Sequence, residues 1–182
     1  MKNTPYLFQS ERLGFRNWTS DDLEEFAKLN ADEDVMEYFP KTLSKSAVAA
    51  LIEKLKSHFA QNGFTYYATE LLDTNELIGM IGMAKQTYKT AYTPAIDIGW
   101  RLKKSAWGKG YATEGAKRCL DYAFNELNLT TLIAVCPINN RKSENVMKKI
   151  GMVKKGAFDH PELVNQPTYE RHVCYEIIRN EG

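Results

Sequence analysis

The chain has 182 residues, 43% of them apolar, which is enough apolar material for one independently folded domain. With 24 basic and 23 acidic residues, its formal net charge of +1 offers no chain-wide attraction to nucleic acid or to an anionic membrane. No apolar run approaches the roughly 18 to 20 residues that cross a bilayer, residues 1–12 lack the apolar core of a secretory signal, and three scattered cysteines make neither a disulfide framework nor a zinc site.

The N-terminal third predicts one strand followed by two helices. Residues 12–16 alternate between apolar and other side chains, which is typical of a strand. Thr19 precedes Asp22 by three residues, a capping-box arrangement that predicts the start of a helix. Ser44 is expected to cap a longer helix, which ends at Gly63 because glycine readily adopts the left-handed conformation of a helix terminus.

The rest of the chain predicts a sheet with two further helices. Strand patterns occupy residues 64–71, 77–87, 95–102, 131–135, 152–158 and 173–178. Helical periodicity occupies 112–127 and 143–150, and Glu114 is expected to pair with Arg118 one turn later. A helix between two neighbouring strands makes a crossover, which pairs those strands in parallel. We therefore expect a mixed α/β sheet with a parallel pair near its middle, in a single domain spanning residues 1–182.

A glycine-containing turn stands between the strand at 95–102 and the helix that follows it. Gly108 and Gly110 allow the backbone to approach a ligand closely, and the N–H groups at the start of the helix favour an anion. The turn therefore resembles a phosphate cradle, although a plain tight turn before a helix has the same pattern. The lysine-hydroxyl pair of nucleotide hydrolases and the third glycine of dinucleotide-binding proteins are both missing.

Basic residues gather on either side of the same crossover. Residues 101–118 hold six basic side chains against one glutamate, and residues 141–155 hold another six against one. Half of the 24 basic residues thus lie in two short segments, which suggests an anionic ligand at the strand ends; solvated helix faces are the alternative. Residues 20–37 are strongly acidic instead, either as a rim that attracts a cationic amine or as a solvated helix start.

Four motifs together resemble the GCN5-related N-acetyltransferases (GNAT), and within them the ribosomal-protein alanine acetyltransferase-like branch. They are Ile96-Asp-Ile-Gly-Trp-Arg-Leu102, Trp107-Gly-Lys-Gly-Tyr-Ala-Thr-Glu114, Asn139-Asn-Arg-Lys-Ser143 and Lys149-Ile-Gly-Met152. The resemblance covers nearly the whole chain and implies a mostly antiparallel mixed sheet with a splayed central parallel pair, flanked by helices. It also implies an enzyme that transfers an acetyl group from acetyl-CoA to a primary amine, either a protein N-terminus or a small molecule. Ser105 departs from the Gln or Arg that begins the family's loop motif, which leaves only the backbone part of that motif intact.

The resemblance implies a binding site for acetyl-CoA and no metal. The pantetheine arm is expected along the strand at 98–102, the pyrophosphate on the N–H groups of 107–112, and the thioester near Ser143. The implied cofactor-binding residues are Trp100, Leu102, Trp107, Gly108, Lys109, Gly110, Tyr111, Ala112, Thr113, Asn140 and Ser143. The alternative for the last two is structural: Ser143 as the N-cap of a helix and Asn140 in a loop.

Three side chains are candidates for the base that deprotonates the amine. Asp97 stands where relatives often carry a glutamate, and its shorter reach favours action through a water molecule. Glu162 and then His160 are the next candidates; each of the three has an ordinary structural role as its alternative. A main-chain N–H near Gly99 or Trp100 is expected to stabilise charge on the thioester oxygen, and Ser143 to protonate the thiolate that leaves.

The leading hypothesis is a cytoplasmic N-acetyltransferase that binds acetyl-CoA and an amine as a monomer or homodimer, without nucleic acid or membrane partners. The alternative is an acyl-CoA-binding sensor that keeps the cradle but has no turnover. Persistence of both Asp97 and Ser143 favours the enzyme. A nucleic-acid-binding module is poorly supported by the overall charge and predicts binding that depends steeply on salt.

Overall fold

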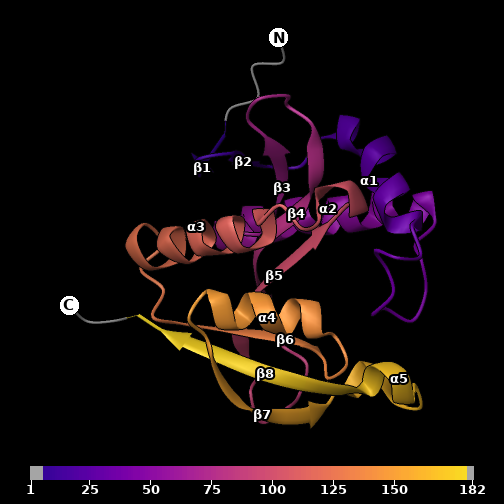
Figure 1. Cartoon of the computed structure of the whole chain (residues 1–182), viewed down its shortest axis with the longest axis vertical. Coiled ribbons are helices and arrows are strands. Elements are labelled where there is room, and N and C mark those ends of the chain that lie inside the picture. Colours follow the sequence, from indigo (N-terminus) through magenta and orange to yellow (C-terminus); the bar gives the residue numbers. More distant parts are fainter. Residues whose placement is uncertain (1–5, 180–182) are drawn as a thin grey trace.

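One mixed sheet of eight strands runs through the computed structural model, which describes residues 6–179 (Figure 1). The strand order is β1-β2-β3-β4-β5-β6-β8-β7. The strands are β1 Phe8–Gln9, β2 Leu13–Arg16, β3 Tyr66–Leu71, β4 Leu77–Gln86, β5 Ala95–Leu102, β6 Thr131–Pro137, β7 Val153–Asp159 and β8 Arg171–Ile178. Neighbouring strands are antiparallel apart from β5 and β6, which are parallel as predicted.

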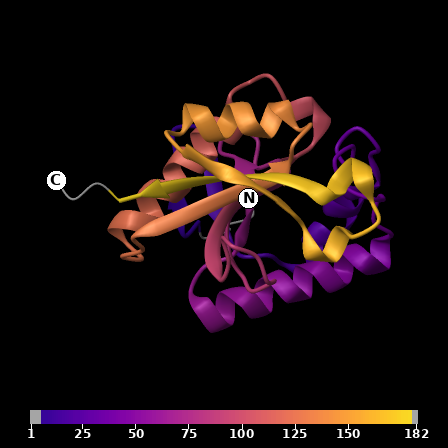
Figure 2. The ribbon, with the colours of Figure 1, turned by 90° about the horizontal axis from the view of Figure 1, so that it is seen from below.

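The helices cover both faces of this sheet. They are α1 Leu23–Ala31, α2 Lys45–Asn62, α3 Tyr111–Asn125, α4 Arg141–Lys149 and α5 Pro167–Glu170, with short 3-10 turns η1 Ser20–Asp22, η2 Lys104–Ala106 and η3 Pro161–Leu163. Figure 2 shows α2 and α4 on opposite sides of the strands. The predicted α/β fold, with helices flanking a sheet that contains one parallel pair, is therefore confirmed.

Each face of the sheet has its own hydrophobic core. Successive residues of a strand point to opposite faces, so Tyr67 packs with residues of α3 while Ala68 packs with residues of α1 and α2. Ile98 of β5 belongs to the α3 side. Since each large apolar side chain contributes about 1.5–3 kcal/mol when fully buried, both layers hold the central strands firmly in register.

The local signals for helix ends act as predicted. The N–H of Thr19 donates to the Asp22 carboxylate at 2.8 Å, and the Ser44 hydroxyl accepts from the N–H of Ala47 at 3.2 Å. Gly63 ends α2 with a φ of +78°. These ends depend on residues only a few positions apart, which is why the sequence predicts them well.

One expectation needs correction, and two features of the sheet were not predicted, because each depends on segments distant in the sequence. Residues 8–9 form an extra edge strand, and β8 lies between β6 and β7. The expected pair of Glu114 and Arg118 is wrong. Glu114 instead accepts from the backbone N–H of Arg12 at 2.8 Å and binds its guanidinium, because the N-terminal strands lie beside the start of α3.

The ends of the expected 1–182 domain, residues 1–5 and 180–182, lie outside the described residues. All three cysteines lie within the described residues 6–179 and are buried as free thiols. Among residues 6–179, no helix has both the length and the apolar character needed to span a bilayer.

Candidate active site

The two parallel strands at the centre of the sheet separate almost as soon as they meet. Within residues 6–179, β5 and β6 share one register pair, Asp97 with Ile133. On its other edge β5 pairs with β4 along its whole length, from Ala95 to Leu102. Beyond Asp97, the edge of β5 that faces β6 therefore has main-chain N–H and C=O groups without a strand partner. Such groups require hydrogen bonds, so this edge suits an extended ligand with polar groups along its length.

The turn between β5 and α3 has the geometry of a phosphate cradle. Gly108 and Gly110 have φ values of +72° and +82°, in the left-handed region that favours glycine. A Cβ atom added at Gly108 meets nothing within 4 Å, so the turn is open to a ligand. Gly110 is the N-cap of α3 and no side chain caps this end, which leaves the N–H groups of residues 111–113 free for an anion. The predicted strand–turn–helix arrangement fits a pyrophosphate.

Other predicted binding residues lie close to this turn. Leu102 is buried and its carbonyl accepts from the indole N–H of Trp107 at 2.8 Å, which ties the turn to the end of β5. The Trp107 ring lies beneath the Lys142 ammonium, 4.7 Å from the ring centroid. Trp100 is half-buried on the α3 side of the sheet, and Lys109 is exposed. The roles of these residues in binding stay predictions.

The two basic segments meet at Trp107, but acidic residues already engage them. Asp34 pairs with Lys104, and Glu37 lies 3.8 Å from Lys142. Within the acidic run at 20–37, Asp34 and Glu37 thus lie beside lysines near the cradle while remaining exposed, and Asp22 is buried in an ion pair with Arg16.

The residue that caps α4 is Asn140 and not Ser143, which the structural alternative had named as the cap. Asn140 is the N-cap of α4, and its Oδ1 accepts from the backbone N–H of Ser143 at 3.0 Å. Ser143 is therefore not the cap, and in the part of the chain that the structure describes its hydroxyl has no hydrogen-bond partner. That hydroxyl is half-buried and free to contact a ligand.

Asp97 lies at the point where β5 and β6 separate and is only 7% exposed. Its Oδ1 accepts from the Tyr66 hydroxyl at 2.5 Å, and its Oδ2 from the Gln86 amide at 3.1 Å. The same amide lies 3.2 Å from the Tyr66 oxygen, which closes a triangle of three side chains. Burial raises the pKa of Asp97 to about 6, against the opposite effect of these hydrogen bonds. The carboxylate is thus mostly ionised at neutral pH yet basic enough to accept a proton.

The sequence analysis missed Tyr66 and Gln86, although one signal pointed to them. Gly82 of β4 pairs with Gly99 of β5 and also with Tyr66 of β3. A Cβ atom at Gly99 would lie 3.1 Å from the Tyr66 ring. Gly99 thus makes room for a ring that crosses to Asp97, whereas Gly82 allows the backbone of residues 65–67 to approach closely. Sequence patterns do indicate this use of strand glycines.

The other candidate bases lie in less suitable surroundings. Glu162 is exposed on η3, where its N–H donates to Nδ1 of His160 at 3.3 Å. His160 packs on the Tyr88 ring with a centroid separation of 4.4 Å, and burial lowers its pKa. Burial also lowers the pKa of His172 to about 4. Both ring nitrogens of His58 bind main-chain groups, 2.8 Å from Phe64 O and 3.1 Å from Lys85 N, so it is structural as expected.

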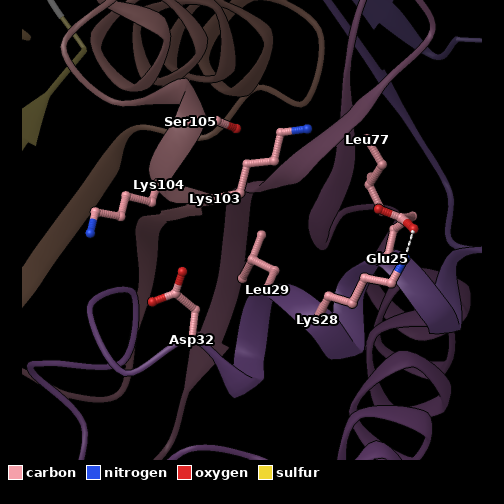
Figure 3. Close-up of a pocket in the computed structure, with 8 residues that line it drawn as sticks. All are labelled: Glu25, Lys28, Leu29, Asp32, Leu77, Lys103, Lys104 and Ser105. Atoms are coloured by element: carbon pink, nitrogen blue, oxygen red, sulfur yellow. Dashed lines mark hydrogen bonds and ion pairs between the residues drawn. The ribbon is translucent and has the colours of Figure 1, made fainter.

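A surface pocket of about 510 Å³ lies beside the cradle, between α1 and the turn after β5. Figure 3 shows Lys28 and Leu29 of α1, with Asp32 just after it, on one side and residues 103–105 on the other. Charges of both signs alternate around it, and Lys28 pairs with Glu25 at its edge. The pocket therefore has no preference for one charge.

Among the described residues, no group of three metal-ligating side chains gathers anywhere.

Comparisons with known proteins agree with the motifs and the fold. The sequence model of the acetyltransferase (GNAT) domain matches residues 12–153. The uncharacterized N-acetyltransferase YnaD of Bacillus subtilis (strain 168) is 33% identical over 150 residues, which cover 82% of this chain and 84% of that protein. A GNAT-family acetyltransferase from Bacillus anthracis superposes with a TM-score of 0.76 at 29% identity, covering 93% of this chain and 96% of that one. The ribosomal-protein-S5-alanine acetyltransferase of Vibrio fischeri has the same fold, with a TM-score of 0.76 at 20% identity and coverage of 96% and 97%. The chain therefore belongs to the GNAT family of N-acetyltransferases, as the motifs predicted.

Proposed function

We propose that this protein transfers the acetyl group of acetyl-CoA to a primary amine by direct attack in a ternary complex. The acceptor is the α-amine of a protein N-terminus or the amine of a small molecule. The observation that carries the proposal is the buried Asp97 carboxylate, which lies where β5 and β6 separate. A proton acceptor thus lies where the unpaired edge of β5 begins, and this edge suits the pantetheine arm of CoA.

The acetyl-CoA site is assembled from three parts of the chain. The unpaired edge of β5, residues 98–102, offers main-chain groups to the pantetheine arm. The turn at 107–110 and the first N–H groups of α3 offer donors to the pyrophosphate. Asn140 remains a candidate contact through its Nδ2, since its Oδ1 already caps α4. When bound, acetyl-CoA supplies an acetyl group activated as a thioester.

The amine must be neutral in order to attack. A peptide α-amine has a pKa of about 7.7–8.0 and is partly neutral at pH 7, whereas a lysine amine near 10.4 is almost wholly protonated. Asp97 accepts the amine proton, directly or through one water molecule, because its own pKa of about 6 keeps it ionised at neutral pH. This modest basicity favours an α-amine or a similarly weak base as acceptor.

Two further groups of the chain act on the thioester end. The main-chain N–H of Trp100 is the candidate to stabilise negative charge on the carbonyl oxygen, because the N–H of Lys103 donates to β4 and alternate N–H groups face the other, unpaired edge of β5. The free hydroxyl of Ser143, one turn into α4, is the candidate proton donor to the thiolate. Neither role requires a metal ion.

Release of free thiol from acetyl-CoA, measured with a panel of amines and short peptides, tests the proposal. Thiol release that depends on an amine, with the acetylated amine found by mass spectrometry, is the expected result. Saturable binding of acetyl-CoA without thiol release from any acceptor contradicts transfer and favours a sensor. Slow release without an amine would show hydrolysis instead.

A further inference from the structure

Arg101 is a partly buried guanidinium that lacks a counter-ion. Its Nη1 donates to Oδ1 of Asn30 at 2.6 Å, and its Cζ lies 4.3 Å above the Phe39 ring. Its Nε is buried without a hydrogen-bond partner, and no carboxylate among residues 6–179 forms an ion pair with it. A guanidinium has five N–H donors and buried charges are normally paired. The site is therefore incomplete until an acceptor of hydrogen bonds, preferably an anion, reaches it.

The position of Arg101 indicates which ligand supplies that anion. Along β5, Asp97, Gly99 and Arg101 share one face, since alternate residues of a strand do so. Arg101 contacts Asn30 of α1 and Phe39 of the segment after it, which places this face on the α1 and α2 side. Helix α3, whose N-terminus forms the phosphate cradle, packs on the opposite face against Ile98. The missing anion is thus expected from the amine acceptor rather than from acetyl-CoA.

A second polar group without a partner lies on the other side of Asp97. Tyr88, in the connection between β4 and β5, has a buried hydroxyl with no hydrogen-bond partner in the described part of the chain. Burial, followed by the charge of Asp97, raises the pKa of this hydroxyl. Along the chain, Asp97 thus stands between two residues that have a buried polar atom without a hydrogen-bond partner in the described part of the chain, Tyr88 and Arg101.

We propose that the acceptor carries a carboxylate that Arg101 binds while its amine lies at Asp97. The inference rests on the proposed function and specifies its substrate class. The opposite charges of Asp97 and Arg101 orient an acceptor with a positive and a negative end, and the guanidinium fork matches a carboxylate. Other carboxylates nearby do not serve, since Asp34 and Glu37 pair with lysines.

The spacing of the two residues narrows the acceptor further. Four strand residues separate their Cα atoms by about 13 Å, and the Arg101 guanidinium contacts Asn30 and Phe39 rather than the Asp97 carboxylate. We therefore expect the amine and the carboxylate to stand several bonds apart. A free α-amino acid holds both groups on one carbon and is too short. An N-terminal peptide with a glutamate at its second or third residue spans the distance, because an extended chain advances about 3.3–3.6 Å per residue. We therefore infer an acidic N-terminal peptide as the acceptor class.

Matched peptides test this inference. Three peptides share one N-terminal residue and carry Glu, Gln or Lys at positions two and three, and thiol release gives kcat and KM for each. The wild type is expected to use the Glu peptide at least tenfold more efficiently than the Gln peptide, through a lower KM. Arg101→Gln should abolish that ratio by raising the KM for the Glu peptide to that for the Gln peptide. Arg101→Lys should restore part of the ratio.

The possible failures are distinguishable. Turnover of all three peptides with no preference for Glu overturns the acidic acceptor and leaves the transferase intact. A Glu preference that survives in Arg101→Gln assigns the carboxylate to another residue, and a weaker Kd for acetyl-CoA in that variant assigns the anion to the CoA phosphates. If no peptide is acetylated, the proposed function fails for peptides. Calorimetry with the CoA-bound wild type then tests the carboxylate site at Arg101 separately. Equal binding of the Glu and Gln peptides would contradict that site.

Discussion

The hydroxyl of Tyr66 lies 2.5 Å from Oδ1 of Asp97, although 31 positions separate the two residues in the chain. The contact spans three strands, because the Tyr66 ring crosses β4 where Gly82 pairs with Gly99. It gives Asp97 a donor deep inside the protein, where an ionised carboxylate without one would be costly. The pair therefore sets how basic Asp97 is, and most of the predictions below depend on it.

The pH dependence of turnover should report the ionisation of Asp97. A base acts only when deprotonated, and burial raises its pKa to about 6, so kcat/KM should fall as the pH drops below about 6. Asp97→Asn should lower kcat/KM by about 10²–10⁴-fold and remove this acid limb. The Kd for acetyl-CoA, measured by calorimetry, should stay within about twofold. An unchanged rate in the variant would assign the base elsewhere, with Glu162 next.

Tyr66→Phe should move the acid limb to higher pH. The Tyr66 hydroxyl donates to the ionised carboxylate and so lowers the pKa of Asp97; its removal lets burial raise that pKa further. The matched control is Tyr67→Phe, because the neighbouring hydroxyl is buried without a partner among the described residues and its ring lies on the other face. A shift in Tyr67→Phe equal to that in Tyr66→Phe would refute the specific role of the hydroxyl.

Asp97→Asn should make the protein more stable at pH 7 while it inactivates the enzyme. The folded-state pKa of Asp97, about 6, lies above the ordinary value of 3.8. Between these values the folded state binds more protons than the unfolded state, so this group lowers the unfolding free energy as the pH rises from 4 to 6. Asp97→Asn removes this fall in unfolding free energy, which amounts to about 1–3 kcal/mol for a shift of about two pKa units. Urea unfolding of both proteins at pH 4 and pH 7 measures it, and a gain equal at both values would contradict the mechanism.

Gly110→Asp should weaken acetyl-CoA binding far more than Gly110→Asn. Both substitutions place a similar side chain at a φ of +82°, where Asn and Asp are the best tolerated residues after glycine. Only Asp brings a negative charge to the N–H groups expected to bind the pyrophosphate. We expect the Kd of the Asp variant to exceed that of the Asn variant by about tenfold or more, a difference of at least about 1.4 kcal/mol. Thermal unfolding of both variants checks that they fold alike, and equal Kd values would remove the phosphates from this turn.

Ser143→Ala should lower kcat more than it lowers cofactor affinity, and should leave stability unchanged. The cap of α4 is the side chain of Asn140, which accepts from the backbone N–H of Ser143 and not from its hydroxyl. Asn140→Ala is the matched comparison, since loss of an N-cap costs about 0.5–2 kcal/mol of stability. Should Ser143→Ala turn over at the wild-type rate, the leaving thiolate takes its proton from another source.

The strand–turn–helix at 98–113 and the caps at Ser44 and Gly63 were predictable because each depends on residues only a few positions apart. Conformation at a left-handed glycine or the first turn of a helix is decided by local sterics and local hydrogen bonds. The motifs around the crossover, Ile96–Leu102 and Trp107–Glu114, likewise identified the family from contiguous residues. Asp97 was selected as a candidate base from its place in such a motif.

What only the tertiary structure decided is which distant side chains surround those local features. Strand register carries Tyr66 and Gln86 to Asp97, brings Arg12 rather than Arg118 to Glu114, and leaves Arg101 beneath Phe39 without a counter-ion. One residue of slip would turn each of these side chains to the opposite face of the sheet. Register is set by the packing of two cores against all the helices together, so no short stretch of sequence contains it. The sequence by itself thus determined the family and the strand–turn–helix of the expected cradle, and the folded sheet determined the environment on which the proposed role of Asp97 as a base depends.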